Sequence, residues 1–336
     1  MRIGIDAMGG DFAPAQPVKG ALEAKSLLGK DDQIVLIGDE PAIRQHLDSQ
    51  AGWPSFIRIA QADQVVGMNE KPVEAHRAKP RNSILRMAEM AAAGEIDACI
   101  SAGNTGACVA ACQMRLRRLS GVSRPGIAIV IPTLHGPVVL CDVGANVDCR
   151  PQHLYQYGVM AAEYSRGICH IADPRVGLLS IGEEDAKGNE LVKETRELLR
   201  GDKSVNFVGN VEGRDIFRGL ADVVVCEGFV GNVCLKLVEG FAENVFQSLF
   251  AQMGKVQGEA AGQLQAAVGK LREKFDFNEY GGAPLLGVNG VCIICHGASQ
   301  HRAIFNAVRV ATGFCRTGIN DRIKARFADS QDARDE

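Results

Sequence analysis

The chain lacks the features that mark membrane-spanning, secreted and nucleic-acid-binding proteins. No apolar run in its 336 residues approaches the ~20 needed to cross a bilayer. A charge follows Met1 at once and no long hydrophobic segment comes next, so we expect no signal peptide and a cytoplasmic protein. The formal net charge of -3 gives no broad basic field, which argues against nucleic acid as a partner.

The signatures of several large enzyme classes are also missing. The chain has no GxxxxGK(S/T) phosphate loop, no HExxH zinc motif and no GxSxG nucleophile elbow. No GxGxxG follows the first predicted strand. These absences argue against P-loop ATPases, zincins, serine hydrolases and simple NAD enzymes.

Eleven cysteines raise the question of disulfides or metal. Most stand within apolar runs, as Cys99, Cys141 and Cys226 do, which favours reduced side chains in a core. Cys292 and Cys295 have CxxC spacing, but no second pair completes a zinc site. Their segment also reads as a strand, where positions three apart face opposite sides. We expect no metal, and a redox or metal role for this pair stays the alternative.

What the chain does have is a regular alternation of strand-like and helix-like segments. Strands are predicted at 2–6, 33–38, 56–60, 97–100, 127–131, 137–141, 176–181, 205–208, 222–226 and 291–295. Helices are predicted at 14–28, 40–50, 81–93, 105–119, 151–168, 189–200 and 299–317. This pattern predicts a three-layer αβα fold with a mainly parallel sheet, in one α/β domain over 1–336. The charged tail from Ala328 should fray.

Residues 233–276 interrupt the alternation. Apolar side chains recur at helical spacing on both sides of Gly254 and Gly258, which predicts a hairpin of two helices. The hairpin is either an ordinary core or dimer face, or a projecting tip that touches a membrane or a protein. Four cations would suit anionic headgroups, although solvated charges look the same: Lys255, Lys270, Arg272 and Lys274.

Several predicted strands end in loops rich in glycine and asparagine, each followed by a predicted helix. Such loops follow the strands that end near Ile100, Leu140, Ile181 and Val225. Ligands of open α/β sheets bind at the carboxyl ends of strands, and helix N-termini present unpaired N–H groups to anions. The sequence therefore predicts an enzyme that handles a small anion, most simply phosphate.

Individual residues in these loops have both structural and chemical interpretations. Asp11 either caps the next helix or lines a cleft, and Asn104 or Thr105 either caps its helix or opens an anion site. Lys187 could pair with phosphate or be a surface lysine. Asn232 could donate to an oxyanion or cap a helix.

Two further basic features stay open in the same way. His296 is either an anion-binding or proton-donating side chain or a structural histidine, and Ser299 reads as the cap of the last predicted helix. A basic stretch could dock an acidic protein, although a solvated helix face is the simpler interpretation. Its members are Arg115, Arg117, Arg118 and Arg124.

Taken together, these segments resemble the bacterial phosphate acyltransferase family, the acyl-acyl carrier protein:phosphate transacylases of phospholipid synthesis. The resemblance covers nearly the whole chain and depends on several long motifs in one order. They are Asp6-Ala-Met-Gly-Gly-Asp11, residues 101–107, 142–146, 182–189 and 227–232, Tyr280-Gly-Gly-Ala283 and His296-Gly297. Many members have Ser after His-Gly where this chain has Ala298, so no hydroxyl is expected there.

The resemblance implies transfer of an acyl group from acyl-acyl carrier protein to inorganic phosphate, without a cofactor or a covalent enzyme intermediate. It implies a fold similar to the phosphotransacetylase and isocitrate dehydrogenase group, a homodimer, and peripheral membrane association through the helical tip. A membrane glycerol-3-phosphate acyltransferase would take the acyl phosphate. Lys187 and Asn232 match the family's functional lysine and asparagine.

The mechanism that follows assigns phosphate to Lys187 and the oxyanion or acyl carbonyl to Asn232. A thioester is already activated, so positioning and electrostatics can replace a nucleophilic side chain. Further substrate or phosphate contacts are assigned to Asp6, Gly9, Gly10, Asn104, Thr105, Gly106, Asn146, His296 and Gly297. Three rivals remain: an acyl-CoA phosphotransferase, a metal-dependent hydroxyacid dehydrogenase, and a non-catalytic membrane scaffold.

Overall fold

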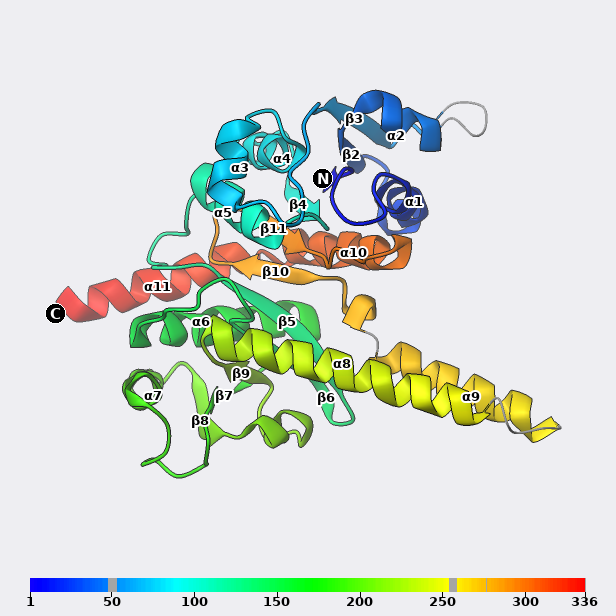
Figure 1. Ribbon diagram of the computed structural model, residues 1–336. Coiled ribbons are helices and arrows are strands. Elements are labelled where there is room, and N and C mark those ends of the chain that lie inside the picture. The colour runs from blue at the N-terminus through cyan, green and yellow to red at the C-terminus, as the bar shows by residue number, and fades with distance from the viewer. Residues whose placement is uncertain (48–52, 254–258, 276, 336) are drawn as a thin grey trace.

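The computed structural model describes residues 1–47, 53–253, 259–275 and 277–335. Eleven strands of this part of the chain form one sheet in the order β3-β2-β1-β4-β11-β10-β5-β6-β9-β7-β8 (Figure 1). Their bounds are Arg2–Asp6 (β1), Gln33–Gly38 (β2), Ile57–Gln61 (β3), Ala98–Ser101 (β4), Gly126–Thr133 (β5), Gly136–Cys141 (β6), Arg175–Leu179 (β7), Asn206–Val211 (β8), Val223–Val225 (β9), Ala283–Leu286 (β10) and Val291–Ile294 (β11).

The sheet consists of two parallel halves that run in opposite directions. β3, β2, β1, β4 and β11 are parallel to one another, and so are β6, β9, β7 and β8. β10 and β5 join the halves through antiparallel pairing with both of their neighbours. The loops after β4 and β11 therefore leave one edge of the sheet, and those after β6 and β9 leave the other.

Helices cover both faces of this sheet. Their bounds are Ala15–Glu23 (α1), Glu40–Leu47 (α2), Pro72–Ala78 (α3), Ser83–Ala92 (α4), Thr105–Arg115 (α5), Pro151–Tyr164 (α6), Glu190–Gly201 (α7), Gly228–Met253 (α8), Glu259–Phe275 (α9), His301–Thr317 (α10) and Ile319–Asp335 (α11). Alternate residues of β2 point to two different apolar clusters, Ile34 and Leu36 to one and Val35 and Ile37 to the other. The predicted αβα arrangement is confirmed, since each face of the sheet has its own core.

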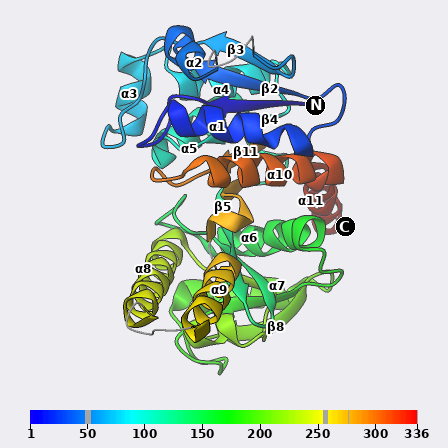
Figure 2. The same cartoon turned by 90° about the vertical axis from the view of Figure 1, so that its right-hand side faces the viewer.

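The helices predicted over 233–276 are α8 and α9, and they pack against each other. Figure 1 shows the pair extending from the body of the molecule, and in Figure 2 the pair points towards the viewer. Gly254, Lys255 and Gly258 lie outside the described residues. Only Gly228 and Gly231 of α8 are buried, although the helix is rich in apolar side chains. The part of α8 after Gly231 therefore exposes apolar side chains that another surface could cover.

Three elements are not among those predicted. α3 begins with Pro72, which suits the first turn of a helix, but it is too short for a clear apolar stripe. β10 contains Pro284 and stands between glycines, which hides a strand in sequence. The expectation that the chain frays from Ala328 is wrong, because α11 continues to Asp335. Ile319, Ile323 and Phe327 bury one stripe of this otherwise polar helix.

Candidate active site

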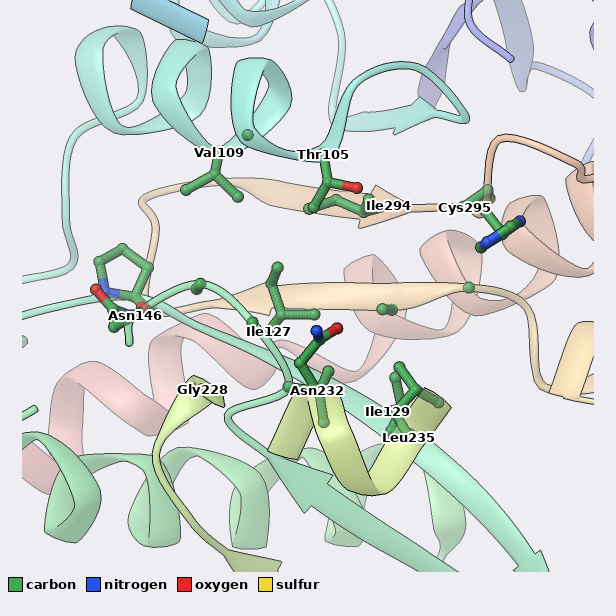
Figure 3. A pocket seen from close by; sticks show the side chains of 18 of the residues that line it. Thr105, Val109, Ile127, Ile129, Asn146, Gly228, Asn232, Leu235, Ile294 and Cys295 are labelled. Atoms are coloured by element: carbon green, nitrogen blue, oxygen red, sulfur yellow. Dashed lines mark hydrogen bonds between the residues drawn. The ribbon is translucent and has the colours of Figure 1, made fainter. Parts of the chain in front are cut away.

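One cavity collects most of the predicted loops. Its volume is about 1030 Å³, and it lies over β11, β10 and β5 between α5 and the first turns of α8 (Figure 3). One face of α5 forms a long wall, made of Thr105, Gly106, Val109, Ala110 and Gln113. Because the two half-sheets run in opposite directions, the loops after β4 and β11 meet the cavity at one end. The loops after β6 and β9 meet it at the other.

The first end is suited to an anion. Thr105, Gly106, His296 and Gly297 line it. Within the described ranges, no oxygen accepts from the backbone N–H groups of Thr105 and Gly106, which begin α5. Such N–H groups, together with the helix dipole, favour negative charge.

His296 adds a donor at this end. Its Nδ1 accepts from the N–H of Ala298 at 3.2 Å, so the proton of the neutral ring belongs on Nε2. The side chain is exposed, and Nε2–H can donate to an oxyanion. Ser299 lines the cavity but does not cap α10, whose N-cap is Gln300; the expected cap is wrong.

Asn104 supports this end from behind rather than lining it. Its Oδ1 accepts from the N–H of Ala107 at 3.0 Å, which confirms the cap of α5. Its Nδ2 donates to the carbonyls of Gly67, Met68 and Glu70. All of its amide groups are therefore engaged, and the residue ties the 67–70 loop to the start of α5.

The turn after β1 has a similar supporting place. Asp6 is 1% exposed, and its carboxylate accepts from the Ser101 hydroxyl at 2.7 Å and from the N–H of Met8 at 3.2 Å. Burial raises the pKa of Asp6, and the hydrogen bonds oppose that rise. Neither Gly9 nor Gly10 lines the cavity, but a Cβ on Gly9 would lie 2.6 Å from the Gly103 nitrogen. Asp11 does line the cavity, and it does not cap α1, whose N-cap is Pro14.

At the second end, Asp142 organises the loop after β6. It is fully buried, and its carboxylate accepts from the backbone N–H groups of Ile127, Gly144, Ala145 and Asn146. Burial raises the pKa of Asp142, and these bonds oppose the rise. In the sequence, Asp142 stands out only as the first residue of the 142–146 motif, with no role of its own. A strand-end aspartate before glycine and asparagine was the available signal.

Asn146 lines this second end but has little freedom to bind a ligand. Its Nδ2 donates to the carbonyl of Pro125 at 2.7 Å and to the hydroxyl of Tyr157 at 2.8 Å. Burial raises the pKa of Tyr157, so its hydroxyl stays protonated. Asn146 thus fixes the cavity wall.

Asn232 is the predicted residue that is best placed for chemistry. It belongs to the first turns of α8, and its amide points into the middle of the cavity (Figure 3). No described residue hydrogen-bonds this amide. The expected capping alternative is not observed, because Glu227 accepts from the N–H groups of Phe229 and Val230.

Lys187 lies outside the cavity. It is exposed in the loop after β7, where its backbone N–H donates to the Glu184 carbonyl at 2.9 Å, and it does not line the cavity. β7 is parallel to β9, so this loop leaves the sheet at the same edge as Gly228. The structure therefore does not bring Lys187 next to His296 within one chain.

The cysteines lie apart from this chemistry, except Cys295 in the lining. All eleven are free. Among the described residues, one group of three buried side chains could hold a metal ion: Cys108 and Cys112 of α5 and Cys292 of β11. Cys108 and Cys292 sulfurs are 3.6 Å apart, a distance that suits a thiol hydrogen bond in a reduced core.

Comparisons with known proteins agree with this architecture. A phosphotransacetylase from Streptococcus pyogenes has a TM-score of 0.64 with 16% identity over 94% of each chain, a likeness of fold. The family model described as "Fatty acid synthesis protein" matches residues 1–322. A phosphate acyltransferase from Trichlorobacter lovleyi is 46% identical over 99% of this chain and 96% of its own. One from Desulfitobacterium hafniense strain DCB-2 is 47% identical over 99% and 100%.

The family model spans nearly the whole chain, and the relatives are nearly half identical to it. Both indicate the same class of reaction, which fits the observed fold. The resemblance inferred from the strand-end motifs is confirmed. The chain belongs to the phosphate acyltransferase family of lipid biosynthesis, and it is an acyltransferase whose reaction involves phosphate.

Proposed function

We propose that the protein makes acyl phosphate from acyl-acyl carrier protein and inorganic phosphate, the first step of membrane phospholipid synthesis. One observation carries the proposal. The N–H groups at the start of α5 and the amide of Asn232, to which no described residue hydrogen-bonds, open onto one cavity with apolar walls. An anion and an acyl carbonyl can meet there without a nucleophilic side chain.

Phosphate binds at the first end of the cavity in this proposal. The N–H groups of Thr105 and Gly106 and Nε2–H of His296 donate to its oxygens. A phosphate oxygen attacks the thioester carbonyl, the carbonyl electrons move onto oxygen, and collapse expels the thiolate. The thiolate is a good leaving group because a thiol pKa is about 8.5.

Asn232 supplies the oxyanion contact. Its Nδ2–H can donate to the developing charge, and one such donor contributes roughly 3–4 kcal/mol in known cases. Apolar lining residues beside it suit the acyl chain: Val109, Ile127, Ile129, Val130 and Leu235. Holding the two reactants together provides the remaining advantage.

Lys187 stays the proposed phosphate-pairing cation, with one added condition. Since it does not line the cavity, the 182–189 loop must fold inward or a second copy must supply it. A homodimer would also cover the apolar side chains that α8 exposes, among them Val233, Leu237 and Phe241. Ile181, 83% exposed just before the Lys187 loop, fits the same interface.

The outer part of the helical pair is proposed to rest on the membrane, with the protein otherwise in the cytoplasm. In the stretches that the structure covers, no helix is long and apolar enough to cross a bilayer. Leu264 and Leu271 of α9 are exposed near Lys270 and Arg272, a composition that suits an anionic lipid surface. The acyl phosphate would pass there to a membrane glycerol-3-phosphate acyltransferase.

Sedimentation with anionic vesicles tests the membrane contact. Leu264→Glu should reduce co-sedimentation, while Val208→Glu, at an exposed apolar side chain of β8, should not. Equal binding by both variants would refute the contact at the tip.

The donor and the reaction are tested together by incubating palmitoyl-carrier protein with the enzyme. We expect thiol release that requires phosphate and gives a product trapped by hydroxylamine. Faster reaction with short acyl-CoA would favour the acyl-CoA phosphotransferase alternative. Reduction of NAD(P) with Mg²⁺ would favour the dehydrogenase. The absence of both thiol release and NAD(P) reduction would contradict catalysis at this site.

A further inference from the structure

Two arginines of the cavity lining form no ion pair with a carboxylate of the described residues. Arg118 and Arg124 stand at the second end, beside Pro125 and Asn146. The hydrogen bonds of their guanidinium groups go to backbone carbonyls, those of Ser123 and Asp148. Lys236, which also lines the cavity, is paired with Glu239 at 3.3 Å. This end therefore keeps positive charge that the described residues leave unneutralised.

A third arginine strengthens the field at the same end. Arg150 is exposed where α6 begins, and no described carboxylate forms an ion pair with it. Burial is the main cause of the lowered pKa of His153, and the positive charges of Arg124 and Arg150 lower it further. The backbone N–H of Arg150 donates to Nδ1 of His153 at 3.1 Å, which places Arg150 beside this histidine.

The loop that carries Arg118 and Arg124 is firmly anchored. The N–H of Leu119 donates to the Gly287 carbonyl at 2.9 Å, and Leu119 is buried. Gln156 of α6 accepts from the Ser123 N–H at 2.8 Å and donates to the Gly121 carbonyl at 2.7 Å. The backbone that presents the two guanidinium groups is thus fixed from both sides, which lowers the entropic cost of holding an anion.

The separation between the two ends limits which anion this can be. Thr105 and Gln113 are eight residues apart on α5, which corresponds to about 12 Å along the helix. Arg118 lies beyond Gln113. The attacking phosphate of the proposed function already occupies the end at Thr105 and His296, where it must contact the carbonyl that Asn232 holds. The arginines face a second anion.

A carrier-bound thioester has such an anion. Its pantetheine arm is a chain of about a dozen bonds that ends in a phosphodiester, roughly 15 Å from the sulfur when extended. We propose that Arg118 and Arg124 bind this phosphodiester while the arm lies along α5, with Arg150 at the entrance. This subsite depends on the proposed function, because it positions that reaction's donor.

The test compares two donors with the same acyl chain, acyl-4′-phosphopantetheine and acyl-pantetheine, which differ only in the phosphate. In the Arg118→Gln/Arg124→Gln double variant, the ratio of their kcat/KM values should fall at least tenfold. The KM for inorganic phosphate should stay within about twofold. Arg58→Gln is the matched control, since Arg58 is exposed on β3 without a described ion pair and should keep the wild-type ratio.

Calorimetry provides a second measurement that does not need turnover. Wild-type protein should bind 4′-phosphopantetheine more tightly than pantetheine, with a preference that salt weakens and the double variant loses. An unchanged preference in the double variant would overturn the proposal. A loss seen only with the whole carrier protein would assign the arginines to its acidic surface instead, and a raised KM for phosphate would assign them to the attacking anion.

The two levels of proposal can fail separately. Wild-type protein that releases no thiol from any donor would contradict the proposed function. The calorimetric preference would still decide whether the arginines recognise the phosphate of the arm.

Discussion

The hydroxyl of Ser101 donates to the carboxylate of Asp6 across 2.7 Å in the core, joining the ends of β4 and β1. The Ser101 Oγ also accepts from the N–H of Gly103 at 3.0 Å. A residue predicted to contact substrate thus holds the loop that leads into α5. The end of the cavity that is proposed to bind phosphate depends on this buried pair.

Ser101→Ala should lower the free energy of unfolding by about 1–3 kcal/mol, because it removes a donor from a buried carboxylate. The KM for phosphate should rise as well, since the start of α5 loses its support. Denaturant unfolding and steady-state kinetics check the two effects. Ser120→Ala, at an exposed serine, is the control, and equal stability of the two variants would contradict this role.

Asn232→Ala should reduce kcat about 100- to 1000-fold and leave the unfolding free energy nearly unchanged. The amide is exposed and has no described hydrogen-bond partner, so its loss affects only the ligand. Single-turnover thiol release gives the rate. If kcat falls less than about threefold, Asn232 is not the oxyanion donor.

Lys187→Ala should raise the KM for phosphate at least tenfold if the lysine reaches the attacking anion. Lys193→Ala is a suitable control on α7, the next helix. Near-normal turnover and an unchanged phosphate KM would remove Lys187 from the mechanism and leave phosphate to Thr105, Gly106 and His296.

Gly231→Ala should prevent the first turns of α8 from packing normally. A Cβ there would collide with the Asp142 carbonyl oxygen, a backbone atom that cannot move aside as the end of a flexible side chain can. We expect a loss of unfolding free energy of roughly 1–3 kcal/mol or more. Gly240→Ala, further along α8 with open space around it, should be neutral or stabilising. A stable Gly231→Ala protein would show that Asp142 and α8 can separate.

Asp222→Asn should cost stability at neutral pH but not in acid. Burial opposes ionisation of Asp222, but hydrogen bonds from the Arg175 side chain and backbone dominate and lower its pKa. A carboxylate whose pKa is lowered by folding stabilises the folded state at pH values above its unfolded-state pKa of about 3.9. This stabilisation disappears as the pH falls through the folded-state pKa.

The wild-type advantage should therefore be about 1 kcal/mol near pH 6, since Arg175 is partly exposed, and should vanish towards roughly pH 2–3. Urea unfolding at several pH values measures it. An advantage that persists unchanged at low pH would contradict the ionic origin.

The sequence alone determined the alternation of strands and helices, because local periodicity and strand-end glycines depend on neighbouring residues. It also indicated the family, the paired helices α8 and α9, and the cap at Asn104. Two elements lack a clear local pattern and could not be predicted. They are the short β10, with Pro284 between glycines, and the mostly polar α11.

Only the tertiary structure decided which strand-end residues share the cavity. Sequence could not show that β10 and β5 reverse the second half of the sheet, because strand direction comes from long-range pairing. That reversal places Thr105 and His296 at one end of the cavity and Asn146 and Gly228, which follow β6 and β9, at the other. Tertiary contacts also make Asp6, Asn104 and Asn146 supporting residues, because residues distant in the chain engage their hydrogen-bonding groups.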